Sequence, residues 1–108
     1  MKKLIWLSYD LSVRGDYEGM YAWLDDNNAR ECGDSLAAFS FEVASNEDLI
    51  SKIKEEINLK VHLKSRDRVY LIWKDSGKMK GRYIFGKRKA SPWEGYGSRE
   101  DSIDIEDS

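Results

Sequence analysis

The stretch LIWLSYDLSVRGDY (Leu4–Tyr17) decides how the first part of the chain folds. Its first half is apolar without a helical period, which predicts a β-strand over Lys3–Tyr9. The apolar run stops at Asp10 and a polar loop follows. Asp16 is then a suitable N-cap for a helix that reaches about Asn27. The stretch therefore predicts strand, loop and helix, with an acidic residue at each boundary.

The remaining chain continues this alternation of strands and helices. Two further strands are predicted over Ala29–Gly33 and Ser35–Ala44, and a helix is predicted over residues 45 to about 57. The clearest strand of the chain follows over Asp67–Asp75, and a returning hairpin strand over Met79–Phe85. This order predicts an α+β fold, a ferredoxin-like β-α-β-β-α-β sandwich with an extra C-terminal strand. Right-handed crossovers place the first strand and the Asp67–Asp75 strand near the middle of the sheet.

Periodicity marks the residues that are expected in the core. A buried stripe at helical spacing is expected on the first helix, and one buried face on the Ser35–Ala44 strand. The helix stripe consists of Tyr17, Met20, Tyr21 and Leu24. The strand face consists of Ala37, Phe39, Phe41 and Val43. The near-continuous apolar run of Asp67–Asp75 predicts a strand covered on both faces. Trp6, Trp23 and Trp73 fit apolar faces, which favours core packing for all three.

The composition limits the class of protein. The chain of 108 residues is 41% hydrophobic and 35% charged, which is typical of one folded domain. We expect that domain over residues 1–90 and an extended or disordered acidic tail over 91–108. The longest apolar run, Val69–Trp73, is too short for a membrane span, so a cytoplasmic protein is expected. Cys32 and His62 are single, which excludes a disulfide or a Cys/His zinc site within one chain.

Charge is distributed unevenly along the chain. Residues 1–59 hold six basic and twelve acidic residues, and residues 90–108 hold one and six. Residues 60–89, between them, hold eleven basic and only two acidic residues. One interpretation is ordinary solvated strand faces, because outward lysines are common. The other is a surface for phosphate groups.

Asp10 is the acidic residue whose position most suggests a metal site. It ends a strand that is expected to be central, and a carboxylate held there faces solvent, which suits Mg²⁺. One carboxylate rarely holds a metal, but a two-fold dimer supplies a second copy. The alternative is that Asp10 only stabilises the following turn through bonds to the backbone. The residues of the sequence leave both interpretations open.

Three short motifs resemble those of the small CRISPR adaptation protein family and its virulence-associated D toxin relatives. They are SYDLS, FSFEV and DRVYLIWK, at Ser8–Ser12, Phe39–Val43 and Asp67–Lys74. That family contains the ferredoxin-like partner of the spacer integrase, described as a metal-dependent endoribonuclease. The resemblance implies that Asp10 binds Mg²⁺ across a homodimer.

The chain also departs from that family pattern. Phe41 matches the Phe of the family's Ser-x-Phe motif, but Phe39 stands at the Ser position. The first helix carries acidic residues where family members often carry Arg and Lys. Both departures favour a protein that has the fold without the activity.

Two functional hypotheses follow. The first is a homodimeric Mg²⁺-dependent phosphodiesterase on RNA or DNA, with Asp10 as catalytic residue and metal ligand. Its nucleic-acid-binding residues would be Lys64, Arg66, Arg68, Arg82, Lys87, Arg88 and Lys89. The second is a non-enzymatic dimeric accessory subunit that binds protein or nucleic acid. In both, the Met79–Phe85 strand is expected at a sheet edge, where it contacts the second copy.

Overall fold

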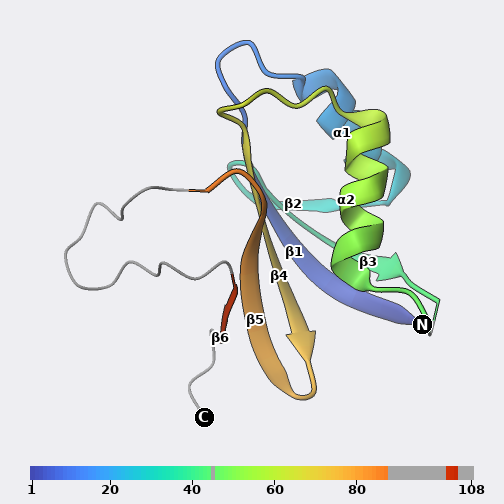
Figure 1. Cartoon of the computed structure of the whole chain (residues 1–108). Helices are drawn as coiled ribbons and strands as arrows, with labels where there is room; N and C mark the ends of the chain where they lie inside the picture. Colours follow the sequence, from blue (N-terminus) through green and yellow to red (C-terminus); the bar gives the residue numbers. More distant parts are fainter. Residues whose placement is uncertain (45, 88–101, 105–108) are drawn as a thin grey trace, which may run out of the picture.

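The computed structural model describes residues 1–44, 46–87 and 102–104 of the chain (Figure 1). Its elements are β1 (Lys2–Asp10), α1 (Tyr17–Asp26), β2 (Arg30–Gly33), β3 (Leu36–Glu42), α2 (Leu49–Lys60), β4 (Arg68–Asp75), β5 (Lys78–Phe85) and β6 (Ser102–Asp104). The strands form one antiparallel sheet in the order β2-β3-β1-β4-β5-β6. The prediction that the first strand and the Asp67–Asp75 strand lie near the middle is confirmed.

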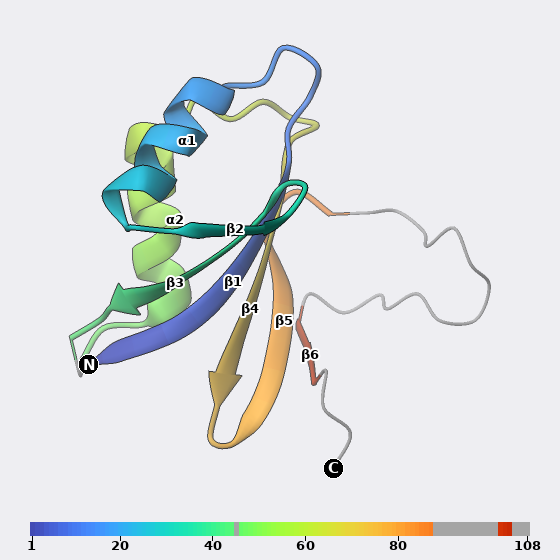
Figure 2. The ribbon, with the colours of Figure 1, turned by 180° about the vertical axis from the view of Figure 1, so that it is seen from behind.

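Both helices lie on the same side of this sheet, as Figures 1 and 2 show from opposite directions. The fold is therefore α+β, with one helical layer and one sheet layer. Within the described residues, neither helix is long and apolar enough to cross a membrane. The second face of the sheet carries no helix among the described elements, and we call it the open face.

The core lies between the helices and every second residue of the central strands. The buried residues of β1, β3 and β4 are Ile5, Leu7, Tyr9, Ala37, Phe39, Phe41, Val69, Leu71 and Trp73. The indole ring of Trp23 on α1 meets the Phe39 ring edge-on at 5.4 Å between centroids. The predicted alternation along the β3 segment is confirmed, because a period of two places alternate side chains under the helices.

Two predictions about burial were wrong. On α1 the buried set is Met20, Trp23 and Leu24, whereas Tyr21 is 53% exposed. The large Trp23 ring packs on the phenylalanines of β3, which turns the buried side of the helix away from Tyr21. Among the described elements, helices cover β4 on one face only, and Ile72 on the open face is half-buried.

The second helix also differs from its prediction. It begins at Leu49 and ends at Lys60, later than predicted at both ends. Asp48 is its N-cap, because the Asp48 side chain accepts a hydrogen bond from the Ser51 N–H at 3.0 Å. Ser45, which was expected near the helix start, lies outside the described residues.

The outer edge of β5 is not open along its whole length. Lys80, Gly81 and Arg82 pair with Asp104, Ile103 and Ser102 of β6. The expectation of an unpaired edge strand at Met79–Phe85 is therefore wrong for these three residues. β6 belongs to the segment 91–108 that was expected to be extended or disordered, and the rest of that segment lies outside the described residues.

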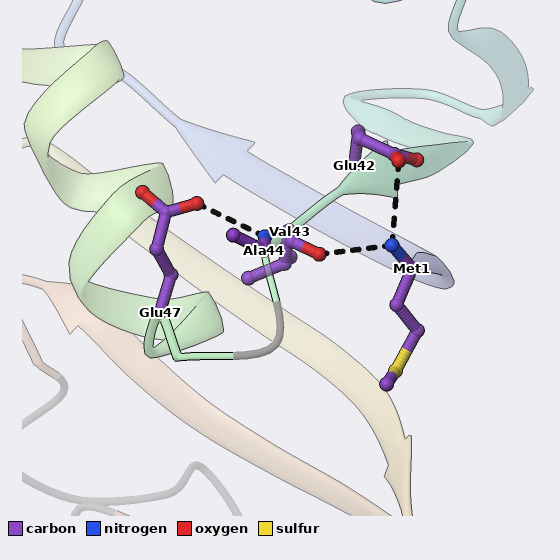
Figure 3. Close-up of polar contacts among 5 residues, drawn as sticks. All are labelled: Met1, Glu42, Val43, Ala44 and Glu47. Carbon is purple, nitrogen blue, oxygen red and sulfur yellow. Dashed lines mark hydrogen bonds and ion pairs between the residues drawn. The ribbon is translucent and has the colours of Figure 1, made fainter.

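At one end of the sheet, the chain start is tied to the end of β3. The Met1 ammonium donates to the Val43 carbonyl oxygen at 3.0 Å and to Glu42 Oε1 at 3.3 Å (Figure 3). The Ala44 N–H donates to Glu47 Oε1 at 3.0 Å. These contacts fix the loop between β3 and α2. They lie at the opposite end of β1 from Asp10.

Candidate functional site

Asp10 and Arg68 face each other across the two central strands. Asp10 ends β1, Arg68 begins β4, and the two residues are register partners on the open face. The Arg68 guanidinium donates a hydrogen bond to Asp10 Oδ2 and forms an ion pair with it. Both side chains keep contact with solvent, at 62% exposure for Asp10 and 31% for Arg68. The structure thus joins the predicted metal ligand to a residue that was predicted to bind nucleic acid.

A single copy of the described chain supplies a poor Mg²⁺ site at Asp10. Among the described residues, no group of three or more His, Cys, Asp or Glu side chains is placed to hold a metal ion. The nearest charged partner of the Asp10 carboxylate is the cation Arg68, which opposes a second positive charge. Mg²⁺ at Asp10 therefore needs ligands from beyond the described residues of one protomer, and the dimer hypothesis supplies them from a second copy.

A second carboxylate, Asp67, joins two loops beside this pair. Its side chain is buried, with only 2% exposure of the residue. Asp67 Oδ1 accepts from the Ser12 N–H at 2.7 Å, and Oδ2 accepts from the Lys64 N–H at 2.8 Å. Ser12 lies in the β1–α1 loop and Lys64 in the α2–β4 connector, so one carboxylate fixes both. Asp67 was not among the functional residues predicted from the sequence.

Asp16 joins the same two loops a second time. Its Oδ1 caps α1 by accepting from the Gly19 N–H at 2.9 Å, and its Oδ2 accepts from the His62 N–H at 2.8 Å. The Lys64 ammonium adds a third connection, donating to the Arg14 carbonyl oxygen at 2.6 Å. The loop tips are therefore held in one arrangement by bonds between residues far apart in sequence.

These bonds keep both carboxylates ionised. Burial alone would raise the pKa of Asp67, but the hydrogen bonds from the Ser12 and Lys64 N–H groups outweigh it and lower the pKa. The N–H groups of His62 and Gly19 lower the pKa of Asp16. Both carboxylates thus accept hydrogen bonds from backbone N–H groups of the protein, Asp67 in a buried position and Asp16 nearer the surface.

The basic side chains of this end remain directed outward. Arg14, Lys64 and Arg66 are exposed residues of the two joined loops. Arg68 follows at the start of β4, and the exposed Lys87 follows β5. We call Arg14, Lys64, Arg66, Arg68 and Lys87 the basic end of the sheet.

Gly86 explains why Lys87 belongs to this group. Its φ of +66° lies in the left-handed region, and a Cβ there would be 2.5 Å from the Asp67 carbonyl oxygen. Only glycine allows the chain to pass so close to the start of β4. Because the next residue is Lys87, the close passage places it beside Arg68.

The other predicted basic residues do not join the basic end. Arg82 is the register partner of Leu71, on the helix-facing side of β5. There it acts on Asp48, whose pKa is lowered mainly by hydrogen bonds from Ser51 and also by the charge of Arg82. Arg88 and Lys89 lie outside the described residues. The strand alternation therefore directs Arg82 away from Arg68, and its predicted role in binding nucleic acid stays a prediction.

Aromatic side chains lie on the open face next to the basic end. Tyr70 of β4 and Tyr83 of β5 are register partners, and their rings form a T-shaped pair with centroids 4.8 Å apart. Trp6 of β1 lies on the same face and is half-buried. Trp6 was expected in the core, and that prediction was wrong because it alternates with Ile5 and Leu7, which face the helices. Burial, with a smaller effect of Tyr83, raises the pKa of Tyr70, so its ring is neutral at pH 7.

Comparisons of the chain with protein-family models, curated proteins and solved structures found no match.

Proposed function

We propose that the chain is a ferredoxin-like, cytoplasmic homodimer that acts as an accessory subunit and binds the phosphate backbone of nucleic acid at its basic end. The order β-α-β-β-α-β along the chain and the strand order β2-β3-β1-β4 support the ferredoxin-like arrangement. The extra strands β5 and β6 extend that sheet on the β4 side.

The observation that carries this proposal is the collection of cations from three separate segments at one end of the sheet. Arg14 comes from the β1–α1 loop, Arg66 and Arg68 from the α2–β4 connector and the adjoining start of β4, and Lys87 from the residues after β5. The acidic residues Asp16 and Asp67 of the same region are bound to backbone N–H groups. The outward field of this end is therefore positive, which is what attracts phosphate groups.

Charge reversal tests the proposal directly. The double variant Arg66→Glu/Lys87→Glu changes two exposed residues that form no hydrogen bond or ion pair with the other described residues. Binding of a fluorescent 20-nucleotide RNA or DNA, followed by anisotropy at 50 mM salt, should weaken at least tenfold. The dependence of log affinity on log salt should also become shallower by about 0.7–0.9 for each lost phosphate contact.

The hairpin between β4 and β5 offers a matched control. Lys74→Glu/Lys78→Glu makes the same change in net charge at the other end of β4 and β5. It should leave most of the affinity in place. Equal losses in the two double variants would show a response to net charge alone, and no binding by the wild-type protein at low salt would refute the proposal.

A second candidate function is the Mg²⁺-dependent phosphodiesterase that the resemblance implies. The exposed position of Asp10 at a strand end, beside the cations of the basic end, favours it. In a two-fold dimer, two Asp10 carboxylates would hold the ion, which would activate water and neutralise charge on the phosphate. Arg68 would then orient the carboxylate or contact the phosphate.

Asp10→Asn separates this enzyme from the accessory subunit. The amide keeps the shape of the side chain but loses the charge that binds a hard cation, so cleavage should be abolished while the fold is retained. Asp34→Asn, an exposed acid in the β2–β3 turn, is the control. Wild-type protein that cleaves neither RNA nor DNA with Mg²⁺ or Mn²⁺ at pH 6–9 would leave the accessory subunit as the only candidate.

A further inference from the structure

The open face next to the basic end has a regular arrangement of side chains. Reading across β3, β1, β4 and β5, the register gives the rows Leu36–Ser8–Tyr70–Tyr83 and Ala38–Trp6–Ile72–Gly81. The row before them, at the basic end, holds the ion pair of Asp10 and Arg68. An aromatic surface therefore begins directly beside the cations.

On one side, the neighbours of the aromatic rings are small. Across the β1–β3 and β1–β4 pairs, Trp6 lies beside Ala38 and Tyr70 lies beside Ser8. Gly81, the register partner of Ile72, precedes Tyr83 by two residues and adds no side chain to that face. Trp6, Tyr70 and Tyr83 are half-buried, so each keeps part of its apolar ring area on the surface, where a planar ligand could contact it.

The open face carries little charge of its own in these two rows. Between Arg68 and Lys74 of β4, the open-face residues are Tyr70 and Ile72. A ligand that combines planar apolar rings with a negatively charged chain matches this surface, since its rings would contact the aromatic side chains and its charges would contact the basic end.

We propose that the open face binds the unpaired bases of single-stranded nucleic acid, stacked on Tyr70, Tyr83 and Trp6, while the basic end holds the adjoining phosphates. This inference rests on the proposed function and names its substrate class. Single strands expose base faces that stack on aromatic side chains, whereas the bases of a duplex are already stacked on each other. The protein should therefore prefer single strands to duplexes.

The affinity of a 12-nucleotide poly-U RNA or poly-dT DNA should exceed that of a 12-base-pair duplex at the same salt. Tyr70→Leu keeps an apolar side chain on the open face but removes the ring, so single-strand affinity should fall about tenfold. Tyr70→Phe keeps the ring and should retain most of the affinity. Tyr21→Leu removes an equally large ring from the exposed side of α1 and is the matched control.

Folding of each variant is checked by its urea midpoint, and Tyr83→Leu repeats the test at the partner ring if Tyr70→Leu unfolds. Equal binding of single strand and duplex, with no effect of Tyr70→Leu, would overturn the inference and leave backbone binding by the basic end intact. Loss of all binding in Arg66→Glu/Lys87→Glu, together with a tenfold loss in Tyr70→Leu, would support both. If Tyr70→Leu instead converts a dimer to a monomer in sedimentation without changing affinity, a second copy occupies the open face and the inference is wrong.

Discussion

Leu71 and Ile72 are neighbours in β4, yet they lie on opposite faces of the sheet. Leu71 is completely buried under the helices, whereas Ile72 is half-buried on the open face. The same contrast applies to Leu7 and Trp6 in β1. The apolar residues of the helix-covered face stabilise the fold, whereas those of the open face are covered by no helix among the described elements.

Two carboxylates at the basic end, Asp67 and Asp10, differ in burial in the same way as Leu71 and Ile72. Asp67 is buried and accepts hydrogen bonds from two backbone N–H groups. Asp10 is exposed and pairs with a single, half-buried cation, Arg68. A buried carboxylate with two charge-assisted bonds contributes substantially to stability, whereas an exposed pair contributes little. Asp67 is thus a residue of the fold, and Asp10 remains available for function.

The largest expected effect tests the difference between the two faces. Leu71→Ala should lower the free energy of unfolding by about 4 kcal/mol, because it removes a fully buried side chain and leaves a cavity. Ile72→Ala should cost about 1 kcal/mol, because the side chain already contacts water. Urea denaturation of both variants measures the difference. Similar losses in the two would mean that another part of the protein covers the open face.

The next effect tests the difference between the two carboxylates. Asp67→Ala should cost about 2–3 kcal/mol, because the Ser12 and Lys64 N–H groups lose their acceptor in a buried place. Asp10→Ala should cost no more than about 1 kcal/mol, the usual value of an exposed ion pair. Thermal or urea unfolding distinguishes them. A larger loss in Asp10→Ala would show that Asp10 is a structural residue.

Much of the fold could be predicted because it depends on local sequence. The strict alternation from Ala37 to Val43 and the Asp16 N-cap need only neighbouring residues to be recognised. The buried side of α1 could not be assigned, because Trp23 and Tyr21 compete for it and the packing of Trp23 on β3 decides. The alternation of Trp6 with buried neighbours was a usable signal for the open face.

The candidate site was less predictable because it is assembled from distant segments. The bonds of Asp67 reach back 55 residues to Ser12. Gly86, the residue before Lys87, lies close against Asp67 and Arg68, which are distant from it in the sequence. The alternation of side chains along the strands would show that Arg82 and Arg68 lie on opposite faces of the sheet. That conclusion requires the register in which β5 pairs with β4, which the sequence does not specify.

The smallest effect is the response of stability to acid. The pKa of Asp67 is lowered from its ordinary value of 3.8 in the folded protein, and the pKa values of Asp16 and Asp48 are lowered too. A lowered folded pKa means that the unfolded chain binds the proton first. The stabilisation is therefore complete above pH 3.8 and is lost as the pH falls through the lower folded values.

Urea midpoints between pH 7 and pH 2.5 should decline below about pH 4, and less steeply in Asp67→Asn, which has no carboxylate to protonate at that position. The effect is smaller than that of Asp67→Ala because a protonated carboxyl group still accepts hydrogen bonds. Identical acid slopes in wild type and Asp67→Asn would show that Asp67 does not control acid stability and would weaken its contrast with Asp10.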